Sequence, residues 1–120
     1  MKKPRRAFHP QLTLWLENSS GEPAFGKGRM IILEAVDAHG SLSAAARALD
    51  MPYRGLWARL RRSEQRLGFP LVVSHAGRGH DSGSVLTPQG RELLERYREL
   101  LRRVTAAADE AGRKILGPPE

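Results

Sequence analysis

The chain has 120 residues, no cysteine, 40% apolar residues and a formal charge of +7. This length supports one domain with a modest core, and the lack of cysteine excludes a disulfide framework or a thiolate zinc site. No apolar run approaches the roughly 20 residues that span a bilayer, and none follows the basic start, so we expect a soluble, cytoplasmic protein whose charge favours a polyanionic partner.

Residues 1–10 form a basic arm that we expect to be flexible, with four lysines and arginines and no carboxylate. Behind it, residues 11–17 alternate leucines with polar or aromatic side chains, which is the period of a half-buried strand. Residues 18–23 predict a turn, and Ala24 and Phe25 can form a return strand, which would make a small hairpin. The FGKGR segment (25–29) lacks the pattern of a phosphate loop and predicts a turn.

Three helices are predicted next. The first spans about 29–39, where apolar residues recur at helical spacing and Gly40 is placed to end the helix in a left-handed conformation. Ser41 is the expected N-cap of a short second helix, LSAAARAL, whose alanines allow another helix to cross closely. The third helix runs from about Tyr53 to Leu67 and stops at Gly68.

The third helix has an aliphatic side and a basic side. At helical spacing, Leu56, Leu60 and Leu67 share one stripe, and arginines occupy the opposite side. Residues 47–78 hold seven arginines against two carboxylates, so much of the basicity is concentrated here. This distribution indicates a nucleic-acid-binding face, and a solvated helix face is the alternative.

Two β-prone runs, LVVS (71–74) and SVLT (84–87), flank a glycine-rich tip and predict a hairpin wing. A last helix is predicted over 88–116, capped by Thr87 and followed by a tail at 117–120. Its apolar stripe alternates by three and four, which is typical of a helix that pairs with another. The stripe comprises Leu94, Tyr97, Leu101, Val104, Ala108, Ala111 and Ile115. The alternative is that its first members pack on their own domain.

In this order the elements predict a mainly α fold with small β elements. We expect a winged helix-turn-helix over 11–87, with an N-terminal strand or hairpin, followed by a dimerisation helix over 88–116. In that fold the third helix enters the major groove and the wing follows the backbone or reaches the minor groove. No catalytic set is evident, and the four histidines fit no rigid metal site, so we expect no enzyme, metal or other cofactor.

The segment HGSLSAAARALDMPYRGLWARLRRSEQRLGFPLV (39–72) resembles the DNA-binding module shared by LysR-type and molybdate-responsive (ModE-type) regulators. MPYRGLW, the wing and SVLTPQGRELLERYREL are more similar to the ModE-type N-terminal domain. The resemblance covers roughly 11–115 and implies a dimeric transcription factor whose third helix reads operator DNA and whose last helix joins the subunits. ModE-type regulators carry C-terminal oxyanion-binding domains, before which this chain stops, so we expect no molybdate binding.

The residues expected to contact DNA come from the second helix, the third helix and the wing. Arg54 and Arg61 are the expected bidentate donors to guanine, and Ala58 leaves room for a thymine methyl group. Trp57 is expected to pack between the third helix and the wing, with direct DNA contact as the alternative. The other expected contacts, to phosphates, carboxylates or a groove edge, come from Ser41, Ser43, Tyr53, Arg62 and Arg78. Arg59 and Arg66 are expected to meet phosphates or carboxylates rather than bases.

We therefore expect a sequence-specific transcriptional regulator that binds an inverted repeat in double-stranded DNA as a homodimer. The expected partners are DNA and a second copy of the chain, with no membrane. Two alternatives stay open: an adaptor or inhibitor that pairs with a full-length regulator, and a nonspecific architectural DNA binder.

Overall fold

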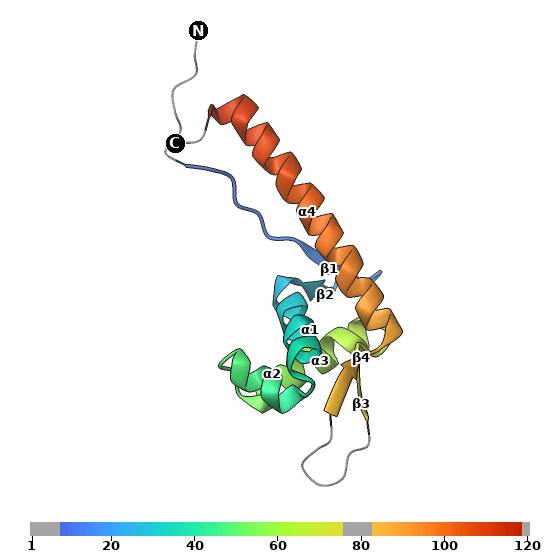
Figure 1. Ribbon diagram of the computed structural model, residues 1–120. Coiled ribbons are helices and arrows are strands. Elements are labelled where there is room, and N and C mark those ends of the chain that lie inside the picture. The colour runs from blue at the N-terminus through green and yellow to red at the C-terminus, as the bar shows by residue number, and fades with distance from the viewer. Residues whose placement is uncertain (1–7, 76–82, 119–120) are drawn as a thin grey trace.

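The computed structural model describes residues 8–75 and 83–118. Figure 1 shows a body of helices and two small hairpins, from which one long helix, α4 (Pro88–Leu116), projects. The elements follow the order β-β-α-α-α-β-β-α. The predicted fold class, a mainly helical winged helix-turn-helix with a long C-terminal helix, is confirmed.

The N-terminal hairpin consists of β1 (Trp15–Glu17) and β2 (Pro23–Gly26), which pair antiparallel. β1 is shorter than the strand predicted over residues 11–17, because β2 pairs only with the last three residues of that segment. The alternation still holds along the whole segment, with Leu12, Leu14 and Leu16 half-buried and their neighbours exposed. The leucines thus face the body of the domain even where the chain is not in a strand.

Three helices follow the hairpin: α1 (Lys27–His39), α2 (Leu42–Ala48) and α3 (Tyr53–Leu67). α1 begins two residues earlier than predicted, directly after β2. Gly40 ends α1 with φ 77° and Gly68 ends α3 with φ 86°. Both lie in the left-handed region that glycine adopts without a Cβ penalty, so the predicted helix ends are confirmed.

The core lies where α1, α2 and α3 meet the two hairpins. Leu33 and Val36 of α1, Leu56 of α3 and Leu71 after it are fully buried. Burial of a side chain of this size stabilises the fold by roughly 1.5 to 3 kcal/mol. Ala45 of α2 is also fully buried, and its small side chain lets α1 and α2 approach closely. The packing of these side chains therefore sets how the three helices cross.

The wing consists of β3 (Val72–His75) and β4 (Gly83–Leu86), paired antiparallel from Val72 opposite Leu86 to His75 opposite Gly83. β4 is joined to the end of α1, because the Ser84 N–H donates to the Gly40 carbonyl at 2.8 Å. The predicted wing is therefore present. Its tip, with Arg78, lies outside the described residues.

α4 begins against the segment that joins α3 to the wing. Thr87 caps it as predicted, because its Oγ1 accepts from the Gly90 N–H at 2.9 Å and donates to the Pro70 carbonyl at 2.7 Å. The Thr87 N–H also donates to the Leu71 carbonyl at 2.9 Å. A Cβ on Gly90 would collide with the backbone of Leu71, so only glycine permits this close approach. The first turn of α4 is thus fixed to residues 70–71.

Two further properties concern the described part of the chain. None of its helices has both the length and the apolar character needed to cross a membrane. Across the same residues, histidines and carboxylates nowhere gather in threes as a metal site would require.

Candidate nucleic-acid interface

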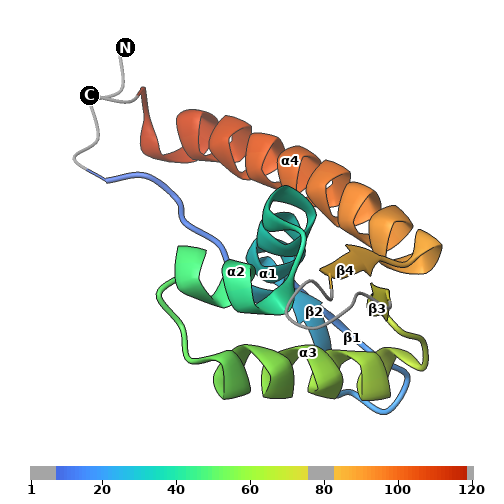
Figure 2. The same ribbon diagram turned by 60° about the horizontal axis from the view of Figure 1, so that its bottom comes forward.

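α2 and α3 are joined by a tight turn over residues 49–52. Ser41 is the predicted N-cap of α2, since its Oγ accepts from the Ala44 N–H at 3.0 Å. In the turn, Asp50 has φ 53°, and the Met51 N–H donates to the Ala46 carbonyl at 2.9 Å. This bonded turn sets α3 across α2, and Figure 2 shows α3 running along one edge of the body towards the wing.

α3 is buried on one side and open on the other. Leu56 and Leu60 are in the core, and Leu67 packs against it from the edge. The side chains exposed on the rest of the helix include all the predicted contact residues of α3, namely Tyr53, Arg54, Trp57, Ala58, Arg61 and Arg62. The structure therefore leaves all six side chains exposed on α3, with Arg62 on the flank that faces the N-terminal hairpin.

Towards the wing, Arg61 is held by two neighbours on α3. Its Nη1 lies 3.0 Å from Glu64 Oε1, and its guanidinium carbon lies 5.3 Å from the centre of the Trp57 ring. Trp57 is 43% exposed and lines an open groove of about 490 Å³ between α3 and the wing, together with Val73. Trp57 thus stands beside the wing without being enclosed by it, and the Arg61 guanidinium is oriented before any ligand arrives.

Glu64 supports this surface, and the sequence did not single it out beyond a possible pairing with arginine. It is buried, and its Oε2 accepts from the N–H groups of Leu71 and Val72 at 2.7 and 3.3 Å. One carboxylate therefore connects the exposed surface of α3 to the base of the wing. Two features of the sequence could have indicated it: Glu64 is the one carboxylate in α3, and it lies next to the leucine stripe.

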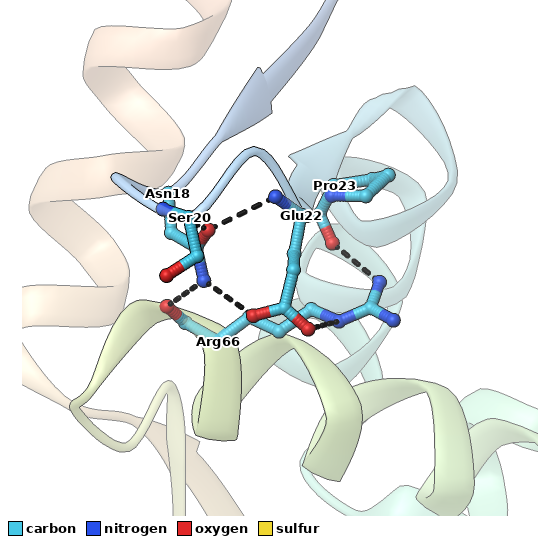
Figure 3. Close-up of polar contacts among 5 residues, drawn as sticks. All are labelled: Asn18, Ser20, Glu22, Pro23 and Arg66. Atoms are coloured by element: carbon cyan, nitrogen blue, oxygen red, sulfur yellow. Dashed lines mark hydrogen bonds and ion pairs between the residues drawn. The ribbon is translucent and has the colours of Figure 1, made fainter.

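On the opposite side, the last turn of α3 is bound to the N-terminal hairpin (Figure 3). Asn18 shapes the hairpin turn by accepting from the Glu22 N–H at 3.0 Å and donates from Nδ2 to the Arg66 carbonyl at 3.1 Å. The Arg66 guanidinium donates to the Pro23 carbonyl at 2.7 Å and lies 3.7 Å from Glu22. Arg66 therefore meets a carboxylate, one of its two expected partners, and that carboxylate belongs to the hairpin.

The remaining predicted contacts lie near the N-terminus of α2 or outside the described chain. Ser43 is exposed in the first turn of α2, beside the half-buried cap Ser41. The structure brings both serines to the same end of the helix-turn-helix. Arg78 is among the residues that the structure does not describe.

The stripe along α4 divides into two parts. Leu94 and Tyr97 are each 1% exposed; the Tyr97 hydroxyl donates to the Leu14 carbonyl at 2.7 Å, and its ring meets Phe25 edge to face at 5.2 Å. These two residues pack on their own domain, which is the alternative that the sequence left open for the first part of the stripe. The rest of the stripe is half-buried or exposed: Leu101, Val104, Ala108, Ala111 and Ile115.

Comparison with known proteins bears on this architecture directly. Residues 28–91 match the family described as bacterial regulatory helix-turn-helix protein, lysR family, over just more than half of the chain. The chain belongs to the lysR family. The match runs from α1 through the helix-turn-helix and the wing to the first turn of α4. Proteins of the lysR family are regulators rather than enzymes, and the N-terminal hairpin of this member lies outside the matched region.

Two curated proteins are similar to this lysR-family chain. The molybdenum-pterin-binding protein MopB of Rhodobacter capsulatus is 35% identical over 72 residues, which cover 60% of this chain and 27% of MopB. The molybdenum transport protein ModE of Azotobacter vinelandii is 29% identical over 92 residues, which cover 77% of this chain and 34% of ModE. The resemblance to ModE-type proteins is confirmed, and this chain spans about a third or less of each relative's length.

Solved structures show the same fold. The DNA-binding domain of BenM, in a complex with benA site 1 DNA, superposes with a TM-score of 0.54 at 23% identity, over 76% of this chain and 97% of that one. CbnR, a LysR family transcriptional regulator, superposes with a TM-score of 0.51 at 27% identity, over 71% of this chain and 28% of CbnR. The lysR-family fold therefore extends over about three quarters of this chain.

Proposed function

We propose that this lysR-family chain is a transcriptional regulator that binds double-stranded DNA in a sequence-specific manner, with α3 in the major groove. The observation that carries the proposal is the composition of the open surface of α3. The helix holds five arginines and a single carboxylate, and that carboxylate, Glu64, is buried and already bonded to the wing. An exposed arginine surface on the second helix of a helix-turn-helix suits entry into a groove about 12 Å wide that is lined by phosphates.

Arg54 is the residue best placed to read a base. It is exposed in the first turn of α3, where base readout concentrates in such domains, and it has no ion pair among the described residues. Its guanidinium can donate two parallel hydrogen bonds to guanine O6 and N7. Tyr53 and Ala58 border the same outward surface, where a phosphate or a thymine methyl group would lie. Arg61, already bonded to Glu64, has fewer free donors for a base.

The homodimer belongs to the same proposal. Five residues on one stripe of α4, from Leu101 to Ile115, follow the spacing of a helix that packs on another helix. Their exposure rises along the helix as α4 leaves the body of the domain, until Ile115 is 75% exposed. A second copy of α4 would cover them. The resulting two-fold symmetry presents two copies of α3 to two half-sites, which favours an inverted-repeat operator.

Selection of bound duplexes from a random pool tests the proposed function. We expect enrichment of one motif, arranged as an inverted repeat. Recovery of random sequences would contradict sequence-specific readout and favour an architectural binder, and a single half-site would contradict the symmetric dimer.

A further inference from the structure

A second basic region lies on the side of α3 that faces the N-terminal hairpin. We call it the arginine cluster and define it as Arg29 of α1 with Arg59, Arg62 and Arg66 of α3. The Arg29 Nε donates to Ser63 Oγ at 2.7 Å, which joins the first turn of α1 to α3. Three members of the cluster, Arg29, Arg62 and Arg66, line a pocket of about 200 Å³ between the hairpin, α1 and α3.

The charge of the cluster is poorly compensated within the chain. Its nearest carboxylate, Glu22, lies 3.7 Å from Arg66. Among residues 8–75 and 83–118, no carboxylate forms an ion pair with Arg29, Arg59 or Arg62. Burial lowers the pKa of the Arg29 guanidinium, and the positive charges of the other three arginines lower it further. A bound anion would reduce the electrostatic repulsion between these positive charges.

The shape and chemistry of the pocket favour a single phosphate group. Planar guanidiniums match phosphate oxygens with paired hydrogen bonds. α1 begins at the pocket after Gly26 without a side-chain cap, so its positive dipole end adds to the potential there. The pocket is smaller than the roughly 300 Å³ at which small-molecule sites begin, which favours one anionic group over a whole metabolite.

The position of the cluster identifies the source of that phosphate. Arg59, Arg62 and Arg66 are on the hairpin flank of α3, whereas Arg54 and Ala58 are on its outward side. A helix that lies in the major groove has sugar-phosphate backbone along both flanks, and contacts there fix its register on the duplex. We propose that the arginine cluster, with Arg29 as its member from α1, binds a backbone phosphate at the edge of the groove that α3 enters. This inference rests on the proposed function.

The test uses Arg62→Gln and Arg29→Gln in the full chain, with Arg113→Gln as the matched control. Arg113 lies in the last turn of α4, and its replacement removes the same single charge. Each protein is titrated by fluorescence anisotropy against the selected duplex and against copies carrying one neutral methylphosphonate at successive backbone positions. We expect one flanking position at which the modification weakens the wild type by about tenfold.

At that position, the modification should weaken Arg62→Gln and Arg29→Gln clearly less than it weakens the wild type, because each variant has already lost one of the guanidiniums that contact the phosphate. The slope of log affinity against log salt should also fall for each variant, by at most about 0.9, which is the value for one phosphate contact. The control should keep the wild-type slope and sensitivity. Arg29→Lys, which retains the charge, provides a second variant if circular dichroism shows that Arg29→Gln does not fold.

Three results would overturn the inference in distinguishable ways. If both cluster variants behave like Arg113→Gln while the wild type still selects a motif, the cluster has no phosphate contact and the proposed function stands. If the wild type selects no motif, the proposed function itself fails and the inference fails with it. If calorimetry at constant ionic strength detects inorganic phosphate in the pocket while DNA affinity is unchanged by Arg62→Gln, the pocket serves a free anion instead.

Discussion

α3 and α4 are both rich in arginine, but they differ in how many of their basic side chains form ion pairs. In the described part of the chain, six of the seven basic side chains of α4 pair with a carboxylate, including Arg98 with Glu34 of α1 and Arg91 with Asp37 of α1. On α3 only Arg61 and Arg66 do so. α4 instead carries an apolar stripe that is half-buried at Leu101, Val104 and Ala108 and exposed at Ala111 and Ile115.

This contrast shows that what a helix leaves uncovered indicates its partner more clearly than its composition does. Uncompensated guanidiniums on α3 suit phosphates and base edges, whereas the neutralised surface of α4 surrounds an apolar stripe that suits another helix. The following predictions test the difference, from the largest expected effect to the smallest.

The apolar stripe gives the largest effect. Val104→Glu should dissociate the proposed dimer, because a carboxylate would enter the centre of a helix pair. Affinity for an inverted repeat should then fall by about 100-fold or more, because the two copies would bind their half-sites independently. Native mass spectrometry and anisotropy would measure the two effects. The control is Ala106→Glu, on the exposed side of the same helix; equal losses for both variants would contradict the proposed interface.

On α3, replacement of an uncompensated arginine should affect readout. Arg54→Ala should cost roughly 1 to 3 kcal/mol of binding free energy on the matched duplex and relax the base preference at one position. Arg96→Ala on α4, where the arginine pairs with Glu92 at 2.6 Å, should leave DNA binding unchanged. Anisotropy titrations on matched and scrambled duplexes compare them, and a uniform loss for Arg54→Ala on every duplex would remove its role in base readout.

The one acidic residue of α3 should matter for stability. Glu64→Ala leaves the buried N–H of Leu71 without its acceptor, so we expect a loss of about 1 to 2 kcal/mol in the free energy of unfolding, measured by urea denaturation. Glu95→Ala on α4 is the control, since Glu95 is exposed. An unchanged midpoint for Glu64→Ala would show that the link between α3 and the wing contributes nothing to the fold.

The paired charges of α4 should give the smallest effect, and it depends on pH. Hydrogen bonds from Arg102 and then Arg103 lower the pKa of Glu99 from its usual 4.5 to about 2. Because the folded-state pKa is depressed, the stabilisation is present above pH 4.5 and is lost as the pH falls towards 2. The difference in melting temperature between wild type and Glu99→Gln should therefore be small and vanish over that range. A carboxyl resonance of Glu99 titrating near 4.5 would contradict the pairing.

Much of the architecture could be predicted because local signals and the fold agree. Gly40, Ser41, Gly68 and Thr87 end or begin helices through backbone conformations and caps that depend on near neighbours in the chain. The spacing of the leucines likewise fixed which side of α3 would be buried. Each of these features is decided within a few residues.

Other features depend on contacts between segments far apart in the sequence. Arg62 and Arg66 look equivalent on a helical projection, but only Arg66 lies where the hairpin supplies Glu22 and the Pro23 carbonyl. The stripe of α4 is continuous in sequence, yet the N-terminal segment contacts Tyr97 and leaves Ile115 open. Periodicity in the sequence identifies an apolar stripe, but it does not show which residues of that stripe other segments of the chain cover.

The short junction at residues 70–71 has a consequence for DNA spacing. Leu71 donates its N–H to Glu64 of α3 and accepts at its carbonyl from Thr87 at the start of α4, so one residue bonds both helices. This residue therefore fixes the direction in which the 29-residue α4 leaves the domain. If two copies join through α4 as proposed, that direction would set the distance between their α3 helices, and with it the length of DNA between the two half-sites.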